Sequence, residues 1–181
     1  MNRGLSGTLR SLERVLARVR PAEVTAFEHL LLGSRRVFVT GLGRTGLIGR
    51  GFAMRLMHLG RRVYHVGDVI TPAIRRGDLL VICSRTGRSP VLLYYVDIAR
   101  KAGARVALVT AERKSPVARR SDAVLHLATD EGKSRPRGAA MPLGSLFEQA
   151  LLLVLDHVIV RLMGALGLEE ADLRRIHTTF E

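Results

Sequence analysis

A polar segment between two apolar stretches carries residue types that could hold a phosphate group. Residues 84–89 follow the apolar run LLVIC and precede a helical pattern that begins at Pro90. They are Ser84, Arg85, Thr86, Gly87, Arg88 and Ser89. Hydroxyl groups and the backbone N–H groups at a helix start can bind phosphate oxygens, but the lysine and spacing of a nucleoside triphosphate loop are absent. A turn with Ser89 as the N-cap before Pro90 explains the same letters equally well.

Two titratable side chains near the C-terminal end could act as acid or base. Glu148 follows Ser145 by three positions, which is the spacing of a capping box that binds the first backbone N–H groups of a helix. Taken alone, this spacing favours the capping role. His177 is a lone histidine in RRIHTTFE, which is more often a surface residue. No histidine has metal-ligand spacing, and the single cysteine, Cys83, reads as a core residue, so we predict no metal site.

A glycine motif offers a different hypothesis. Gly41, Gly43 and Gly46 match the dinucleotide fingerprint, and Asp68 stands where a ribose-binding acid is expected. However, a helical region over residues 2–32 precedes the first strand, and this interpretation leaves residues 84–89 unused. Binding of NAD(P) is therefore kept as a secondary hypothesis.

The remaining sequence predicts the elements that position these residues. Apolar runs predict strands at 36–40, 61–66, 78–84, 105–110 and 123–128. Periodic segments predict helices at 46–59, 91–102, 115–121, 145–164 and 168–178, after a helical region that breaks at Pro21. Residues 129–143 read as a polar loop. This alternation predicts an α/β fold, a doubly wound five-stranded parallel sheet flanked by helices. Ligands of such sheets bind at the carboxyl ends of the strands, which selects residues 40–46 and 84–89.

The amino-acid composition limits the classes of protein to which this chain can belong. The 181 residues are 47% hydrophobic and 25% charged, which suits a single domain over residues 1–181, with an N-terminal helical region at 1–33 and C-terminal helices at 145–181. The formal net charge of +13 comes from arginines that are spread along the chain, which favours a solvated surface over a specific nucleic-acid site. The apolar segment 151–168 contains Asp156, His157 and Arg161, so it is no membrane span. One cysteine fits a reducing, cytoplasmic setting.

Taken together, the segments resemble the sugar isomerase (SIS) domain and, within it, the 6-phospho-3-hexuloisomerases. The matching stretches cover almost the whole chain in the expected order: VFVTGLGRTGLIGRGFAMRLMHLG, VYHVGDVITPAIRRGDLLVICS, MPLGSLFEQALLLVLDHVI and IHTTFE. The resemblance implies a homo-tetramer that uses no cofactor or metal. It also implies the conversion of 3-hexulose 6-phosphate to fructose 6-phosphate, a step of formaldehyde fixation in the ribulose monophosphate pathway.

The resemblance also implies roles for individual residues. Glu148 is the implied base, and His177, reaching in from a neighbouring subunit, is the implied proton donor. Arg44 would steady the developing oxyanion. The sugar phosphate would be held by Ser84, Thr86, Gly87 and Ser89, with Gly43, Arg44 and Thr45 near the substrate.

The second loop departs from the pattern Ser-Gly-Ser-Gly-Glu-Thr that is common in the family. Arg85 and Arg88 add two positive charges, which should strengthen phosphate binding if the side chains face the site. A phosphosugar isomerase is therefore the leading hypothesis. A non-catalytic phosphosugar-binding module is the alternative, because SIS domains also serve as sensors in regulators. We expect no specific nucleic-acid partner and no membrane.

Overall fold

The computed structural model describes residues 3–129 and 142–180. Most of the expected polar loop at 129–143 lies outside these residues. The helices are α1 (Arg3–Leu16), α2 (Pro21–Leu32), α3 (Gly43–His58), α4 (Pro90–Lys101), η1 (Ala118–Arg120), α5 (Ser145–Leu166) and α6 (Glu170–Ile176). The strands are β1 (Val37–Gly41), β2 (Val63–His65), β3 (Leu79–Cys83), β4 (Arg105–Thr110) and β5 (Ala123–His126). Every predicted strand is confirmed, and the predicted break before Pro21 separates α1 from α2.

The five strands form one parallel sheet in the order β2-β1-β3-β4-β5. The chain steps outward from β1 to β2 and then returns to β3 on the other side of β1. Because the direction of winding reverses there, the topological switch point lies between β1 and β3. The predicted doubly wound parallel sheet is confirmed, and its switch point falls between the two strands that precede the candidate loops.

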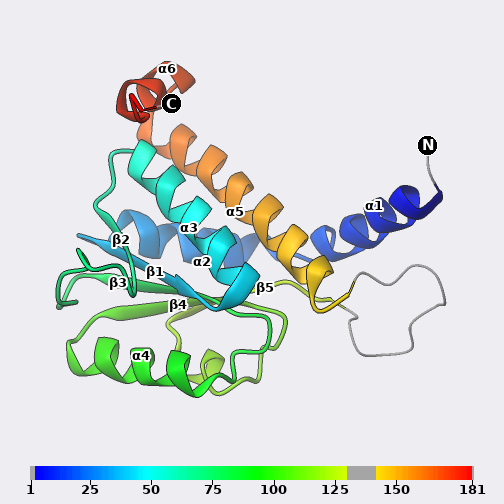
Figure 1. The fold of residues 1–181 in the computed structure, drawn as a ribbon, viewed down its shortest axis with the longest axis horizontal. Helices are drawn as coiled ribbons and strands as arrows, with labels where there is room; N and C mark the ends of the chain where they lie inside the picture. Colours follow the sequence, from blue (N-terminus) through cyan, green and yellow to red (C-terminus); the bar gives the residue numbers. More distant parts are fainter. Residues whose placement is uncertain (1–2, 130–141, 181) are drawn as a thin grey trace.

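Helices cover both faces of the sheet, as Figure 1 shows. On one face, α2, α3 and α5 enclose a large apolar core that includes the fully buried Phe27, Leu56 and Phe147. On the other face, α4 and η1 cover a smaller cluster around Leu80, Leu108 and Val96. Side chains of each strand alternate between the two clusters, because successive residues of a strand point to opposite faces.

Two predicted helix boundaries were wrong. Helix α3 begins at Gly43 instead of residue 46, so Arg44 and Thr45 lie in its first turn. The expected helix at 115–121 is only the short turn η1. The N–H group of Val117 donates to the carbonyl of Gly87 and is therefore not available for a helical hydrogen bond.

Helix α5 is the central helix of the core. By length and composition it could cross a membrane. One face of the helix, which includes Phe147 and Leu151, is instead buried against the sheet and neighbouring helices, whereas Leu152, Leu153 and Val160 are exposed. Its Arg161 forms an ion pair with Glu28 of α2, with Nη2 2.9 Å from Oε2. The expectation that this segment is no membrane span agrees with this packing.

Candidate functional site

The two candidate loops lie side by side at the carboxyl edge of the sheet. Gly41 at the end of β1 is in register with Cys83 at the end of β3. The segment that enters α3 and residues 84–89 therefore leave neighbouring strands at the switch point. This is where an open α/β sheet forms its ligand crevice.

The glycine motif packs helix α3 onto the end of β1. A Cβ atom on Gly46 would lie 2.4 Å from the backbone oxygen of Gly41, and one on Gly41 would lie 2.9 Å from the backbone oxygen of Cys83. Both positions therefore exclude any side chain, because backbone atoms cannot move aside as a flexible side chain can. Asp68, the acid of the dinucleotide hypothesis, is held by Arg50 of α3, with Oδ1 2.8 Å from Nη2. These contacts give the motif a packing role that needs no nucleotide.

Residues 84–89 form a loop that neighbouring strands hold in place. The backbone N–H of Ser84 donates to Val109 of β4, and the N–H of Gly87 donates to Oγ of Ser84 at 3.1 Å. The carbonyl of Arg85 accepts from the hydroxyl of Thr110 and from the N–H of Ala111, both at 3.0 Å. The loop is thus a preformed structure that would not need to be ordered by a ligand.

Gly87 is required by the shape of this loop. Its φ of +59° lies in the left-handed region, which glycine adopts without steric cost. A Cβ atom here would also lie 2.3 Å from Oγ of the buried Ser115. The hydroxyl of Ser115 in turn accepts a hydrogen bond from the N–H of Ala118, the first residue of η1. Local sequence did not identify Ser115, because its contact with the loop is formed between segments far apart in the chain.

Some hydroxyl groups of the loop are not used in hydrogen bonds among the described residues. Ser89 does occupy the N-cap position of α4, with Pro90 at the first helical position, but its side chain makes no capping hydrogen bond. Within residues 3–129 and 142–180, the hydroxyls of Thr86 and Ser89 have no hydrogen-bond partner, and both residues are partly exposed. The capping role therefore accounts for the position of Ser89 but not for its hydroxyl.

The two unusual arginines of the loop have different surroundings. Arg88 is turned to the segment after β4, where its Nε and Nη2 lie 3.0 and 2.9 Å from Oε2 of Glu112. Its side chain remains 61% exposed, so this ion pair is weak and exchangeable. Arg85 is only partly exposed, and its guanidinium has no ion-pair partner among the described residues.

Glu148 is not part of a capping box, so that prediction was wrong. Gly144, at a φ of +89°, is the N-cap of α5, which places Ser145 inside the helix. The hydroxyl of Ser145 donates to the carbonyl of Pro142 at 2.6 Å, and the N–H of Glu148 donates to the carbonyl of Gly144. The helix thus begins one residue too early for Ser145 to be its N-cap. The carboxylate of Glu148 is left free of any capping role.

The Glu148 carboxylate instead faces the first turn of α3. Its Oε2 lies 3.1 Å from Nε of Arg44, and Nη1 of Arg44 donates to Oγ of Ser145 at 3.4 Å. The Glu148 side chain is 10% exposed, whereas that of Arg44 is 66% exposed. Oε2 is closed to solvent and accepts no well-directed hydrogen bond, so the contact with Arg44 is an ion pair only. A buried carboxylate oxygen without a hydrogen bond is costly and marks a site that folding alone does not explain.

His177 lies far from Glu148 within one chain. Its ring packs on the buried His58, with the ring centroids 5.0 Å apart, where α6 meets the end of α3. Arg44 is at the other end of α3, about 21 Å away at 1.5 Å per residue. Figure 1 shows α6 beyond the C-terminal end of α5, at the other end of that helix from Glu148. A catalytic role for His177 thus requires a second subunit, and it stays a prediction.

Cys83 lies beneath the site but is not suited to react. Its side chain is fully buried, and this burial raises the pKa of the thiol to about 12. We expect the folded protein to resist a thiol reagent such as Ellman's reagent at pH 8, because almost no thiolate is present. The thiol should react fully after unfolding in urea. Rapid reaction without urea would contradict the buried, neutral state.

No metal cluster is formed within the part of the chain that the structure describes: residues 3–129 and 142–180 contain no group of three His, Cys, Asp or Glu side chains placed to hold an ion. The site therefore consists of loop hydroxyls, backbone N–H groups, arginines and one buried carboxylate. Such a set can bind a phosphate and move a proton.

Comparison with known proteins places these features in a family. Residues 30–154 match the SIS domain. The 3-hexulose-6-phosphate isomerase of Mycobacterium gastri is 40% identical over 169 residues, which cover 91% of this chain and 83% of that protein. The enzyme of the same name from Methylomonas aminofaciens is 36% identical over 146 residues, covering 81% of each chain.

Solved structures agree with this relationship. A Methanococcus jannaschii protein, whose crystal structure infers a molecular function of 3-hexulose-6-phosphate isomerase, superposes with a TM-score of 0.86 at 27% identity and covers 98% of both chains. Similarity of the backbone and similarity of the sequence thus point to the same group of proteins. The chain belongs to the SIS domain family.

Proposed function

We propose that this protein is a phosphosugar isomerase that interconverts 3-hexulose 6-phosphate and fructose 6-phosphate. The observation that carries the proposal is the buried Glu148 carboxylate, which caps no helix and lies beside Arg44 next to a hydroxyl-bearing loop. The relatives from Mycobacterium gastri and Methylomonas aminofaciens carry the name of this isomerase. The corresponding place in metabolism is formaldehyde fixation through the ribulose monophosphate pathway.

The loop at residues 84–89 would hold the phosphate of the sugar. The uncommitted hydroxyls of Thr86 and Ser89 and the N–H groups at the start of α4 are suitable donors to phosphate oxygens. Gly87 keeps the backbone close enough for that contact. Arg85 and Arg88 would add positive charge at the rim of the loop. For this, Arg88 would leave its ion pair with Glu112 and bind the phosphate instead.

Glu148 would perform the proton transfer. In the open-chain 3-ketose, its carboxylate removes the proton from C2, and the C–H electron pair forms a double bond between C2 and C3. The C3 carbonyl oxygen becomes an oxyanion, which the guanidinium of Arg44, 3.1 Å from Oε2 of Glu148, would stabilise. Return of that proton at C3 and transfer of the C2 hydroxyl proton to the C3 oxyanion produce the 2-ketose. A positioned base contributes about 10² to 10⁴ in rate to such a step.

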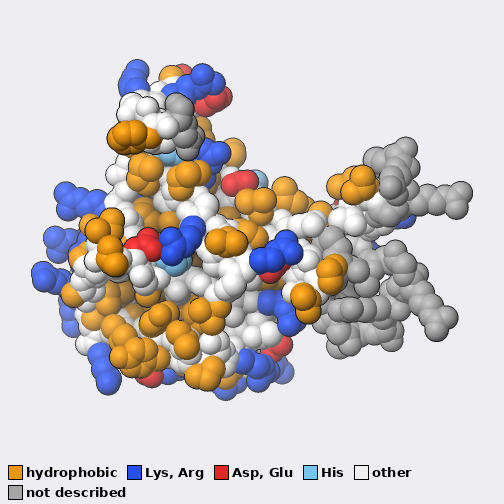
Figure 2. Space-filling model, viewed as in Figure 1, with side chains coloured by type: hydrophobic (Ala, Val, Ile, Leu, Met, Phe, Trp, Pro, Cys, Tyr) orange, Lys and Arg blue, Asp and Glu red, His pale blue; other side chains and the backbone are white. Residues whose placement is uncertain are grey.

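A homo-oligomer, most simply the tetramer implied by the resemblance, would bring His177 of one subunit to the site of another. Large apolar side chains are exposed outside the core, including Val69, Ile70 and Tyr94. Figure 2 shows apolar side chains gathered over α4 and along α3 and α5. Exposed apolar patches of this kind mark surfaces for association.

Mixing two inactive variants tests the shared site. If Glu148 and His177 act across an interface, Glu148→Gln and His177→Ala homo-oligomers should both be nearly inactive. Mixed oligomers formed by co-refolding should regain part of the activity, because some sites then contain neither substitution. Absence of recovery in verified mixed oligomers would remove His177 from the shared site.

Proton exchange tests the isomerase function itself. The protein is incubated with fructose 6-phosphate in D₂O, and the C3 proton of the sugar and the C2 proton of its isomer are followed by NMR. We expect progressive loss of the C3 signal over many turnovers, because the proton held by the base at the enediolate stage is replaced by solvent deuterium in a share of the passes. Binding without exchange would instead establish a phosphosugar-binding module, the alternative function.

The buried free cysteine supports a reducing, cytoplasmic compartment for the reaction.

Substitution of Arg88 tests the phosphate loop. Arg88→Glu puts a carboxylate opposite Glu112 and near the ligand phosphate, so we expect the affinity for fructose 6-phosphate to fall about tenfold. Isothermal titration calorimetry measures the change, and Glu112→Gln serves as the matched variant that releases Arg88 without removing it. Equal affinity in Arg88→Glu and the wild type would show that Arg88 faces away from the phosphate.

A further inference from the structure

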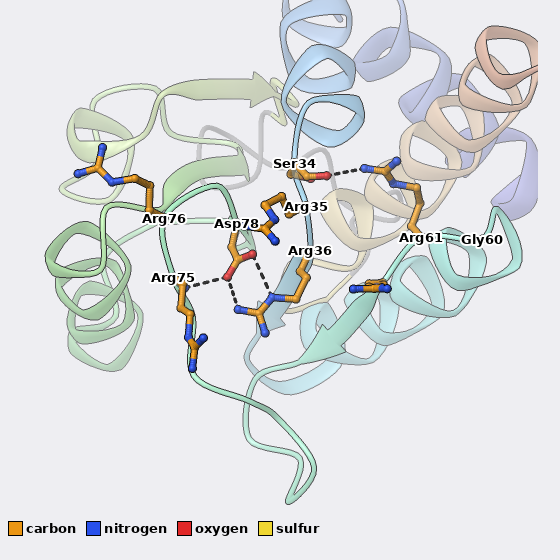
Figure 3. A pocket seen from close by; sticks show the side chains of 9 residues that line it. Ser34, Arg35, Arg36, Gly60, Arg61, Arg75, Arg76 and Asp78 are labelled. Atoms are coloured by element: carbon orange, nitrogen blue, oxygen red, sulfur yellow. Dashed lines mark hydrogen bonds and ion pairs between the residues drawn. The ribbon is translucent and has the colours of Figure 1, made fainter.

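A second polar hollow lies at the opposite, amino-terminal edge of the sheet. Its volume is about 510 Å³, which is within the usual range of small-molecule sites. We call it the amino-edge pocket, and its lining residues are Ser34, Arg35, Arg36, Gly60, Arg61, Arg62, Arg75, Arg76 and Asp78. Six arginines against one aspartate give the lining a formal charge of +5. The loops that enter β1, β2 and β3 bring these residues together, as Figure 3 shows.

Two of the arginines hold the walls of the pocket. Arg36 makes a bidentate contact with the buried Asp78, with Nε 3.0 Å from Oδ1 and Nη2 2.6 Å from Oδ2. Nη2 of Arg61 donates to the carbonyl of Ser34 at 2.6 Å and to that of Leu31 at 3.0 Å, where α2 ends. These bonds fix the loops relative to one another, so the pocket exists before any ligand arrives.

The remaining guanidinium groups have no such partners. Among the described residues, the side chains of Arg35, Arg62 and Arg75 make no hydrogen bond or ion pair. Arg76 lies against Gly103, and its guanidinium points away from the centre of the pocket in Figure 3. The single carboxylate of the pocket, Asp78, is already occupied by Arg36 and by the backbone N–H of Arg75 at 2.8 Å. The positive charge is therefore not neutralised by the residues that the structure describes.

Many other arginines of the chain do face a carboxylate. Examples are Arg100 with Asp122, Arg113 with Glu23 and Arg161 with Glu28. An Arg-rich surface alone would not gather unpaired guanidinium groups around one walled hollow. Repulsion between them costs stability unless an anion is bound, so the pocket is a place where an anion would be favoured.

We propose that the amino-edge pocket binds a small anion that bears two or more phosphate groups. The three guanidinium groups that have no partner among the described residues, those of Arg35, Arg62 and Arg75, carry a charge of +3, which exceeds what one phosphate neutralises. Guanidinium forks also match phosphate oxygens in geometry. None of the described residues that line the pocket is aromatic, so they offer no platform for a nucleobase. The site is separate from residues 84–89, which lie at the carboxyl edge, and it does not rest on the proposed isomerase function.

Tripolyphosphate is the probe that tests this proposal. Isothermal titration calorimetry of the full chain at a fixed, near-physiological salt concentration should show one site per chain that binds tripolyphosphate more tightly than inorganic phosphate. The variant Arg35→Gln/Arg62→Gln/Arg75→Gln should weaken binding about 1,000-fold, at about tenfold for each of the three lost charge-assisted contacts. It should fold normally, because these side chains make no bonds among the described residues.

Matched controls distinguish binding in the pocket from a general effect of positive charge. The variant Arg10→Gln/Arg20→Gln/Arg119→Gln removes the same charge from positions elsewhere and should bind tripolyphosphate almost as the wild type does. Equal losses in the two triple variants, or no binding by the wild type, would overturn the proposal. Loss of the tripolyphosphate site in Ser84→Ala/Thr86→Ala would overturn it too, because the anion would then occupy the carboxyl edge. A short single-stranded oligonucleotide that binds more tightly than tripolyphosphate would assign the charge to nucleic acid instead.

Discussion

Replacing Glu148 with glutamine should abolish proton exchange while leaving the phosphosugar bound. The carboxylate is the proposed base, and its amide isostere keeps the shape of the buried side chain but cannot accept the proton. We expect exchange at C3 of fructose 6-phosphate to fall by about 10⁴, the upper range for a positioned base. NMR in D₂O measures the exchange rate, and calorimetry measures the affinity, which should change little because residues 84–89 are intact.

A second buried glutamate supplies the control. Glu28 also pairs with an arginine of a neighbouring helix, Arg161, but it lies on α2 away from the two loops. Glu28→Gln should lower the midpoint of urea unfolding, since Arg161 loses its charged partner, while exchange per folded molecule stays near the wild-type value. If Glu148→Gln keeps its activity, Glu148 has only a structural role, and the proposed mechanism fails.

Replacing Gly46 with alanine should destabilise the whole domain. The added Cβ would lie 2.4 Å from the backbone oxygen of Gly41, and neither backbone can yield without moving α3 away from β1. We expect a loss of about 3 kcal/mol in the free energy of unfolding, the cost of a severe overpacking. The change should also reduce activity in the molecules that still fold, because Arg44 is carried by the same first turn. Urea unfolding followed by circular dichroism measures the loss.

Gly51 provides the matched control on the same helix. A Cβ atom there meets nothing within 4 Å, so Gly51→Ala adds no clash. Alanine is a better helix former than glycine, and we expect this variant to gain about 0.5 to 1 kcal/mol. Opposite signs for the two substitutions would confirm that close packing, not helix propensity, requires Gly46. Equal stability of Gly46→Ala and the wild type would contradict the strand–helix contact.

The fold was predictable because the signals for it are local and repeated. Each strand is a short apolar run, such as LLVIC at 79–83, and each is separated from the next by a polar or periodic segment. Alternating strands and helices leave few arrangements other than a parallel sheet covered on both faces. Prediction failed at helix starts, where Gly43 and Gly144 act through unusual φ values that local propensity does not reveal.

Sequence alone also determined which segments carry the chemistry. The hydroxyl-bearing residues and arginines at positions 84–89 can be read directly from the sequence. The rule that ligands bind at the carboxyl ends of parallel strands selects that loop together with residues 40–46. Both inferences depend only on residue type and on the order of elements. Neither requires knowing which side chains meet.

Tertiary structure decided the role of each residue, because roles depend on contacts between segments far apart in the chain. Ser145 and Glu148 have the spacing of a capping box. In the structure, however, Gly144 is the N-cap of the helix, and the carboxylate of Glu148 forms an ion pair with Arg44. His177 is separated from that carboxylate by the length of α3, a distance that no motif contains. The amino-edge pocket likewise exists only because three loops converge at one edge of the sheet, so arginines spread along the sequence become neighbours in space.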